Sequence, residues 1–257
     1  MRHTGKSTLV TAHTLPLLLA LLLGGMVVSG SVRGDEDRRR IELPEPRDTG
    51  TTLAEALRAR RSVRDYPTDS LTVEEIATLL WAAQGITESQ RGFRAAPSAG
   101  ATFPIEVYLV VGSDVRSSVS GSTDQPESGD TIDAGAYRYL PDEHALELFR
   151  SEDLRDDLYR AALRQDSVGS APAVIVITAV TARTSRRYGA RAERYIAMEA
   201  GHVSQNIYLQ AAALDLGTVA IGAFEDDQVA RVLGLSRGEN PLYLMPVGRL
   251  RSSQTGR

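Results

Sequence analysis

The sequence predicts a single domain of the α+β class, and three observations lead to this prediction. The chain has 257 residues, of which 42% are hydrophobic and 24% are charged, which suits one globular domain with a sizeable core. About four apolar runs rich in β-branched residues are typical of strands. Helical patterns separate these runs, but without the regular alternation of βαβ units, and this order favours α+β over a doubly wound parallel sheet.

The N-terminal 30 residues have the plan of a secretory signal peptide. Arg2 and Lys6 form a basic start, and an apolar run over residues 15–28 is followed by the small residues SGS. The run is short for a membrane span. We therefore expect cleavage near Gly30 and an exported protein, with an uncleaved membrane anchor as the alternative.

The rest of the chain divides into an arm, a domain and a tail. Residues 31–50 are charged and marked by prolines, and they predict a linker or an extended arm. Residues 51–251 carry the periodic apolar patterns and form the expected domain. Residues 252–257 form a short polar tail.

The domain begins with two predicted helices. Thr51 and Thr52 are possible caps of the first, which should end near the arginines that follow residue 57. In the second, Thr72 is the predicted N-cap, Glu75 completes a capping box and Gly85 ends the helix.

Later elements follow from apolar runs and periods. The polar segment 113–135 has no apolar period and predicts a loop. The long helix is predicted from an apolar stripe that includes Ile196, Val203 and Ile207. The expected elements are strands at 105–112, 136–140, 171–180, 218–224 and 241–249, one or two helices within 144–168, and helices at 190–217 and 226–235.

Composition excludes several kinds of chemistry. The chain has no cysteine, and Lys6 is its only lysine, so thiol chemistry, Cys-ligated metals and a catalytic lysine in the domain are excluded. His144 and His202 lack metal-ligand spacing, so no metal site is expected. The formal net charge of −4 argues against a nucleic-acid partner. An enzyme of this composition would need an organic cofactor.

Three short segments could hold such a cofactor. RARRSVRDY (58–66) places Arg60, Ser62 and Arg64 at a helix end, where guanidinium and hydroxyl groups could bind a mononucleotide phosphate. Its alternative is a solvated charged face, and Arg58 is expected in solvent in either case. AAPSAGATFP (95–104) and VAIGAF (219–224) allow close backbone approach to a flat ligand. Their alternatives are an ordinary turn and a tight connection.

Taken in chain order, the motifs resemble a known family. RRSVRDY, LTVEEIATLLWAAQGI, PSAGATFPIEVYLVV, APAVIVIT, YGARAERYIAMEAGHVSQNIYLQAAALDLG, AIGAF and LMPVG, spread from Leu53 to Arg249, resemble the nitroreductase superfamily. PSAG and GH..QN look closest to its SagB-type dehydrogenase branch. The resemblance implies an FMN-dependent oxidoreductase. It also implies a central, mostly antiparallel sheet flanked by helices, and a homodimer with flavin sites at the subunit interface.

The resemblance implies roles for individual residues. Arg60 and Ser62 would hold the FMN phosphate and ribityl chain, Arg249 would complete the phosphate clamp, and Arg64 would approach the N1/O2 edge of the ring. The residues implied to contact the ring are Pro97, Ser98, Ala99, Gln165, Gly222 and Ala223. Of these, the first three would pack on the ring edge from the second subunit. Gln165 would bind the pyrimidine side, and the last two would offer backbone contacts near N5 and O4.

The chain departs from the family pattern in one pair. Azoline-oxidising relatives use a Lys–Tyr pair, and the nearest match is Arg187 with Tyr188 in RRYGAR. Arginine is too basic to accept a proton, so Tyr188 is the catalytic candidate and azole formation is in doubt. The substrate is expected to be a small molecule or a peptide. Export disfavours NAD(P)H as the donor and favours a dehydrogenase role. The alternative is a catalytically inactive flavin-binding or docking subunit of a peptide-modifying complex.

Overall fold

The computed structural model describes residues 39–67, 69–112, 115–116 and 131–251. The predicted signal peptide, the start of the arm, most of the 113–135 loop and the C-terminal tail lie outside the described residues. The α-helices are α1 (Leu53–Ala59), α2 (Val73–Gln84), α3 (Arg155–Ala161), α4 (Asp166–Ser170), α5 (Thr181–Tyr188), α6 (Ala192–Ala213) and α7 (Asp226–Leu233). Short 3-10 helices are η1 (Ala99–Ala101) and η2 (Gly189–Arg191).

Within the described ranges, seven strands form one sheet in the order β1-β8-β7-β4-β9-β11-β10. Its neighbouring strands pair antiparallel. Two small hairpins, β2–β3 and β5–β6, lie outside it. The strands are β1 (Arg40–Glu42), β2 (Ile86–Glu88), β3 (Phe93–Arg94), β4 (Ile105–Val111), β5 (Val115–Arg116), β6 (Thr131–Ile132), β7 (Gly135–Leu140), β8 (Ala145–Arg150), β9 (Ala173–Val180), β10 (Leu216–Thr218) and β11 (Glu239–Arg249).

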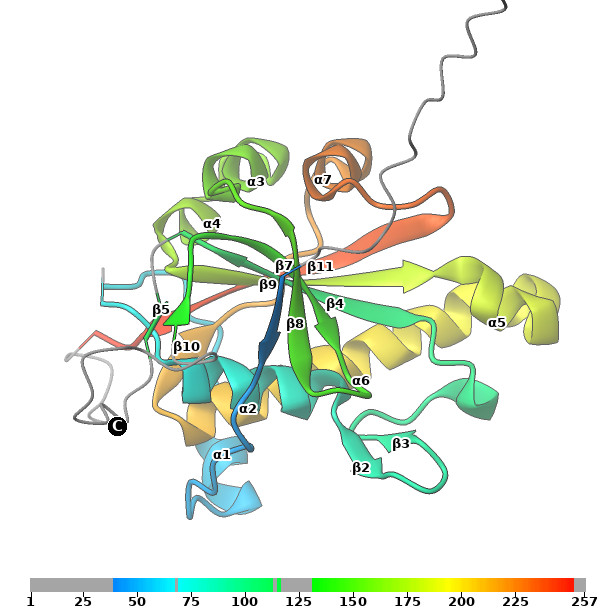
Figure 1. The fold of residues 1–257 in the computed structure, drawn as a ribbon, viewed down its shortest axis with the longest axis horizontal. Coiled ribbons are helices and arrows are strands. Elements are labelled where there is room, and N and C mark those ends of the chain that lie inside the picture. Colours follow the sequence, from blue (N-terminus) through cyan, green and yellow to red (C-terminus); the bar gives the residue numbers. More distant parts are fainter. Residues whose placement is uncertain (1–38, 68, 113–114, 117–130, 252–257) are drawn as a thin grey trace, which may run out of the picture. The chain divides into compact units, whose positions relative to one another are not determined.

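The central strands are buried on both faces, because helices cover the sheet from both sides (Figure 1). Side chains alternate between the faces of a strand, and β4 sends Val107 and Leu109 to one core and Tyr108 and Val110 to the other. The first core contains α2 and α6, and the second contains α3, α4 and α7. This double burial explains why these strands are nearly continuous apolar runs. The predicted α+β class with a mostly antiparallel sheet flanked by helices is confirmed.

Local signals place the first two helices correctly. The side chains of Thr52 and Thr72 accept hydrogen bonds from the backbone N–H groups of Glu55 and Glu75 at 3.3 Å, and both capping boxes are complete. Gly85 caps the end of α2. In the part of the chain that the structure describes, no helix is long and apolar enough to cross a membrane.

Several predicted elements are wrong in detail. Residues 145–150 form β8, not a helix, because the turn at 141–144 folds them back on β7 as a hairpin. This pairing overrides the helix propensity of Ala, Leu and Glu. The helix α5 was not expected, and the strand predicted at 218–224 reduces to β10 and a single bridge from Ile221 to Leu244. The expected arm contributes the edge strand β1, whose Ile41 is buried.

Candidate functional site

The chain that follows α1 lies along the edge of the sheet beside β10. Ser62 forms a parallel bridge with Thr218, and the Val63 N–H donates to the Thr218 carbonyl at 2.9 Å. A Cβ on Gly217 would lie 2.8 Å from Val63 Cβ, so a glycine is needed for this close approach. The predicted cofactor segment is therefore fixed by its backbone to the outermost strand.

The same segment is anchored a second time through Tyr66. Its hydroxyl donates to the carbonyls of Val63, at 2.5 Å, and Pro246, at 3.2 Å. A Cβ on Gly248 would lie 2.8 Å from Tyr66 Cβ. Burial raises the pKa of Tyr66 above its ordinary value, so the phenol keeps its proton well into the alkaline range. The motifs RDY and PVG thus meet in one packing contact.

Tyr208, on the last turns of α6, joins this segment to the turn after β10. The Ala220 N–H donates to the Tyr208 hydroxyl at 2.8 Å, which leaves the hydroxyl free to donate to Ser62 Oγ at 3.0 Å. Arg60 Cζ lies 5.1 Å from the centre of the Tyr208 ring, within the range of a cation–π contact. We call Arg60, Ser62, Tyr208, Thr218 and Ala220 the edge cluster.

The edge cluster has unused hydrogen-bonding capacity. The Arg60 side chain forms no hydrogen bond or ion pair with the described residues apart from its contact with the Tyr208 ring. Thr218 Oγ1 is buried and also lacks a partner among the described residues. Ser62 and Arg64 are exposed. The Ser62 hydroxyl and the positive charge of Arg64 therefore face outward where the sequence predicted an anion site.

Three further predicted residues meet at the turn after β10. Gln165, at the start of α4, donates from Nε2 to the carbonyls of Ala162, at 2.9 Å, and Ala223, at 2.8 Å. Gly222 is exposed above the Tyr243 ring, which would lie 3.7 Å from an added Cβ. Gln165 thus holds the turn that bears Gly222 and Ala223.

Arg249, at the end of β11, is already paired. Its Nη1 and Nη2 contact the two carboxylate oxygens of Glu75 at 2.5 and 3.0 Å, and Nη2 also donates to the Ser70 carbonyl at 3.4 Å. Glu75 is also the capping residue of α2, since Oε2 accepts from the Thr72 N–H at 2.8 Å. Arg249 therefore ties β11 to the start of α2. A phosphate at this position would have to share the Arg249 guanidinium with Glu75.

A second group of predicted residues lies around η1. A Cβ on Gly100, which has φ of 59°, would lie 2.5 Å from the Tyr188 hydroxyl, and Arg187 Nη1 donates to the Gly100 carbonyl at 3.2 Å. Tyr188 also packs edge-on against Tyr195, with ring centres 4.9 Å apart. The segment that begins at Pro97, which is itself exposed, is thus held against the RRY motif.

Glu199, on α6, supports the same turn from inside. It is 2% exposed. Burial raises the pKa of Glu199, while the nearby polar groups of Ser98 and Ala99 and the positive charge of Arg94 act in the opposite direction. Its Oε1 has no partner among the described residues. We call Ser98, Ala99, Gly100, Tyr188 and Glu199 the turn cluster.

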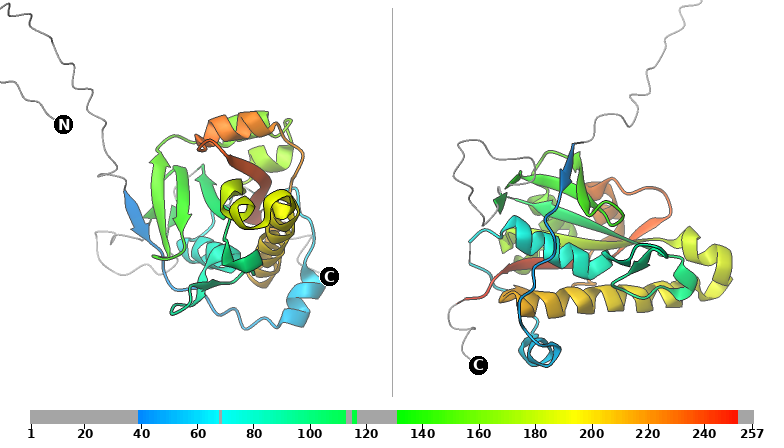
Figure 2. Two further views of the ribbon diagram at one scale, coloured as in Figure 1. Left: turned by 90° about the vertical axis from the view of Figure 1, so that its right-hand side faces the viewer. Right: turned by 60° about the horizontal axis from the view of Figure 1, so that its bottom comes forward.

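The predicted site residues therefore form two groups in one chain. Tyr208 belongs to the edge cluster and Glu199 to the turn cluster, and nine residues of α6 separate them, or roughly 13 Å. Figure 2 shows α6 running along one side of the fold between these regions. Sequence reasoning missed Tyr208 and gave Glu199 no role. The two residues lie on opposite sides of α6, because nine residues correspond to two and a half helical turns, so no shared periodic pattern indicated them.

A sequence profile described as the Nitroreductase family matches residues 57–249 of this chain. The chain belongs to the nitroreductase family. The matched range contains both clusters and the paired Arg249, so the geometry described above belongs to the family domain. The chain is accordingly an oxidoreductase of the nitroreductase family.

Known proteins agree with this placement. A Methanocaldococcus jannaschii protein that carries a nitroreductase name is 41% identical over 213 residues, which are 83% of this chain and 98% of that protein. A crystal structure of a protein designated a nitroreductase from Ralstonia eutropha JMP134 has a TM-score of 0.70 and 33% identity, and the match covers 85% of this chain and 92% of that one. The predicted nitroreductase-like fold is therefore confirmed.

Two more distant similarities are to proteins of microcin processing. The microcin B17-processing protein McbC of Escherichia coli is 28% identical over 171 residues, 66% of this chain and 58% of that protein. A chain in the structure of the Escherichia coli microcin synthetase McbBCD complex with truncated pro-MccB17 bound has a TM-score of 0.60 and 25% identity, with 75% of this chain and 69% of that chain covered.

Proposed function

We propose that this protein is an FMN-dependent oxidoreductase of the SagB-type dehydrogenase branch. The observation that carries the proposal is the junction made by Tyr208. It holds the Arg60–Ser62 segment against the turn at Ala220, and the next part of that turn is bound by Gln165. Residues that are far apart in the sequence and that the family resemblance assigns to one cofactor thus lie at one edge of the sheet.

The chemistry of the edge cluster fits a flavin mononucleotide. Arg60 and the Ser62 hydroxyl are the donors that a phosphate and a ribityl chain require. FMN held there would supply hydride-transfer chemistry between two substrates. In this proposal Gln165 and the Ala223 backbone orient the ring, and Arg64 supplies positive charge near its N1/O2 edge.

The separation of the two clusters favours a homodimer. In this proposal, Pro97, Ser98 and Ala99 of one chain reach the flavin held by the edge cluster of its partner. Exposed apolar side chains support the proposal, because Leu53 and Leu57 on α1 are 66% and 53% exposed, and α1 projects beside α6 (Figure 2). We expect size-exclusion chromatography to show a dimer that Leu57→Glu dissociates.

Tyr188 is the proposed catalytic residue. Its hydroxyl lies against Gly100, next to the segment assigned to the ring edge, and it could hold a proton at Oη during substrate oxidation. Arg187 beside it donates to the Gly100 carbonyl, so in this proposal Arg187 positions the turn and takes no proton.

The likeness to McbC favours a second candidate function, a docking or flavin-binding subunit of a peptide-modifying complex. Catalysis separates the two. An enzyme should show photoreduced flavin that is reoxidised by air or by an added acceptor over many cycles, whereas a docking subunit should bind a partner without turnover.

We also propose export of the protein, which N-terminal sequencing of the mature chain from a fractionated native host would test.

A pair of arginine variants tests the cofactor assignment. Arg60→Ala should weaken FMN binding by at least about tenfold, because one charge-assisted contact is worth about 1.5–3 kcal/mol. Arg58→Ala is the matched control, since Arg58 is an exposed neighbour on α1. Equal FMN retention in both variants would contradict the residue assignment.

A further inference from the structure

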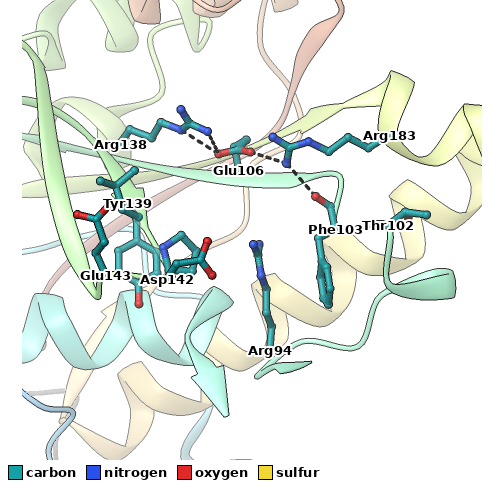
Figure 3. Close-up of a pocket in the computed structure, with 11 residues that line it drawn as sticks. Arg94, Thr102, Phe103, Glu106, Arg138, Tyr139, Asp142, Glu143 and Arg183 are labelled. Atoms are coloured by element: carbon teal, nitrogen blue, oxygen red, sulfur yellow. Dashed lines mark hydrogen bonds and ion pairs between the residues drawn. The ribbon is translucent and has the colours of Figure 1, made fainter. Parts of the chain in front are cut away.

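A pocket of about 350 Å³ lies beside the segment that follows the turn cluster (Figure 3), and no residue of the edge cluster lines it. One wall is the segment after η1, where the Phe103 N–H donates to Ser98 Oγ at 2.9 Å. Another is Arg183 on α5, the helix that carries Tyr188. The strands β4 and β7 and residues 141–143 of the turn after β7 close the remaining side. Its volume is at the lower end of the range for small-ligand pockets.

The back wall of the pocket carries more positive than negative charge. Glu106 is only 8% exposed and pairs with Arg138 Nη2 at 2.8 Å and with Arg183 Nη1 at 2.5 Å. Arg183 Nη1 also donates to the Phe103 carbonyl at 2.9 Å. One carboxylate thus faces two guanidinium groups on this wall, while Asp142 and Glu143 bring negative charge from the turn after β7, where Glu143 pairs with Arg40 at 2.9 Å.

Arg94, at the end of β3, faces this wall; its hydrogen-bond partner is neutral, and the carboxylates of Asp142, Glu106 and Glu199 act on it only through space. Its Nη1 donates to Gln84 Oε1 at 3.0 Å, and its Cζ lies 4.6 Å from the centre of the Phe103 ring. No carboxylate of the described residues forms an ion pair with it. Figure 3 shows its guanidinium pointing into the pocket between Asp142 and Phe103. Most of its five N–H donors are therefore available to a ligand.

We propose that this pocket binds a carboxylate group, with Arg94 as its principal partner. A planar carboxylate matches the guanidinium fork. The acidic side chains of Asp142 and Glu143 also line the pocket, and they oppose a phosphate dianion more strongly than a monoanion. The site is formed within one chain and needs no flavin, so the proposal goes beyond the proposed FMN function and does not depend on it.

Calorimetric titration of the purified full-length protein at low salt tests the proposal. Benzoate is the probe, and benzamide is its neutral counterpart of the same shape. We expect benzoate to bind and benzamide to bind at least about tenfold more weakly, because a tenfold change corresponds to about 1.4 kcal/mol. Equal binding of the two compounds, or no binding of benzoate, would overturn the proposal.

Two variants test whether Arg94 is the residue that binds the carboxylate. Arg94→Gln should weaken benzoate binding about tenfold. Arg91→Gln is its control, because Arg91 also packs on a phenyl ring, that of Phe93 at 4.5 Å, but is exposed, pairs with Glu88 and does not line the pocket. Equal affinities in the two variants would refute the role of Arg94.

Asp142→Asn keeps the test decisive if Arg94→Gln loses its fold. Asp142 is exposed, and its removal should tighten benzoate binding a few-fold by relieving repulsion, whereas unchanged or weaker binding would overturn the proposal.

Short acetylated peptides with a free or an amidated C-terminus distinguish the sources of the carboxylate. If the free peptide binds more tightly than benzoate, the site takes a peptide terminus; if benzoate binds more tightly, it takes a small carboxylate.

Discussion

The substitution Tyr208→Phe removes one hydroxyl and tests how the edge cluster is held together. This hydroxyl takes part in two hydrogen bonds, with Ser62 Oγ at 3.0 Å and with the Ala220 N–H at 2.8 Å. At about 1 kcal/mol net for each bond, the variant should lose roughly 2 kcal/mol of unfolding free energy. For a domain of this size, that loss lowers Tm by roughly 4–8 °C. The phenyl ring itself remains under Arg60.

Thermal denaturation with and without FMN measures both expected effects. Without this hydroxyl, Ser62 and the turn at Ala220 are free to move, and FMN must order them when it binds. If this ordering costs about 1.4 kcal/mol, FMN binding weakens about tenfold. Tyr195→Phe is the matched control, because Tyr195 lies on the same helix and its hydroxyl forms no hydrogen bond with the described residues. The same Tm and FMN affinity in the two variants would refute the role assigned to Tyr208.

Two further predictions concern buried carboxylates. Burial raises the pKa of Glu199, so the native state binds more protons than the unfolded state, and stability should fall as pH rises from 4.5 through the native pKa. Glu199→Gln should therefore unfold at higher temperature than wild type at neutral pH, and the difference should vanish below pH 4.5 in a Tm–pH series. Arg249→Ala should cost about 3 kcal/mol in urea denaturation, because Glu75, whose side chain is only 6% exposed, loses its partner. Arg251→Ala, which breaks the exposed pair with Asp65, should cost less than about 1 kcal/mol, and similar losses in both variants would contradict this reasoning.

The features predicted correctly from the sequence depend on contacts between near neighbours. The capping boxes at Thr52 and Thr72 span three residues each, so their residue types are sufficient to place the helix starts. The strands β4 and β9 were readable because burial on both faces requires an apolar residue at nearly every position. Motif order then supplied the family and, with it, the predicted type of fold.

The features that were missed depend on contacts between distant segments. Residues 145–150 have helix-forming side chains, and only their pairing with β7 makes them a strand. Tyr208 lies 146 residues from Ser62 in the chain, and no local pattern indicates that contact. The pairing of Arg249 with Glu75 likewise spans 174 residues. The sequence could therefore name Arg249 as a cation at the site but could not indicate that a carboxylate already binds it.

Titration of the purified protein with FMN, followed by calorimetry and by the absorbance spectrum, tests the central claim most directly. We predict stoichiometric binding, a yellow complex and a rise in Tm, all retained in Arg58→Ala and strongly reduced in Arg60→Ala. A colourless protein whose Tm is unchanged by FMN would contradict the account.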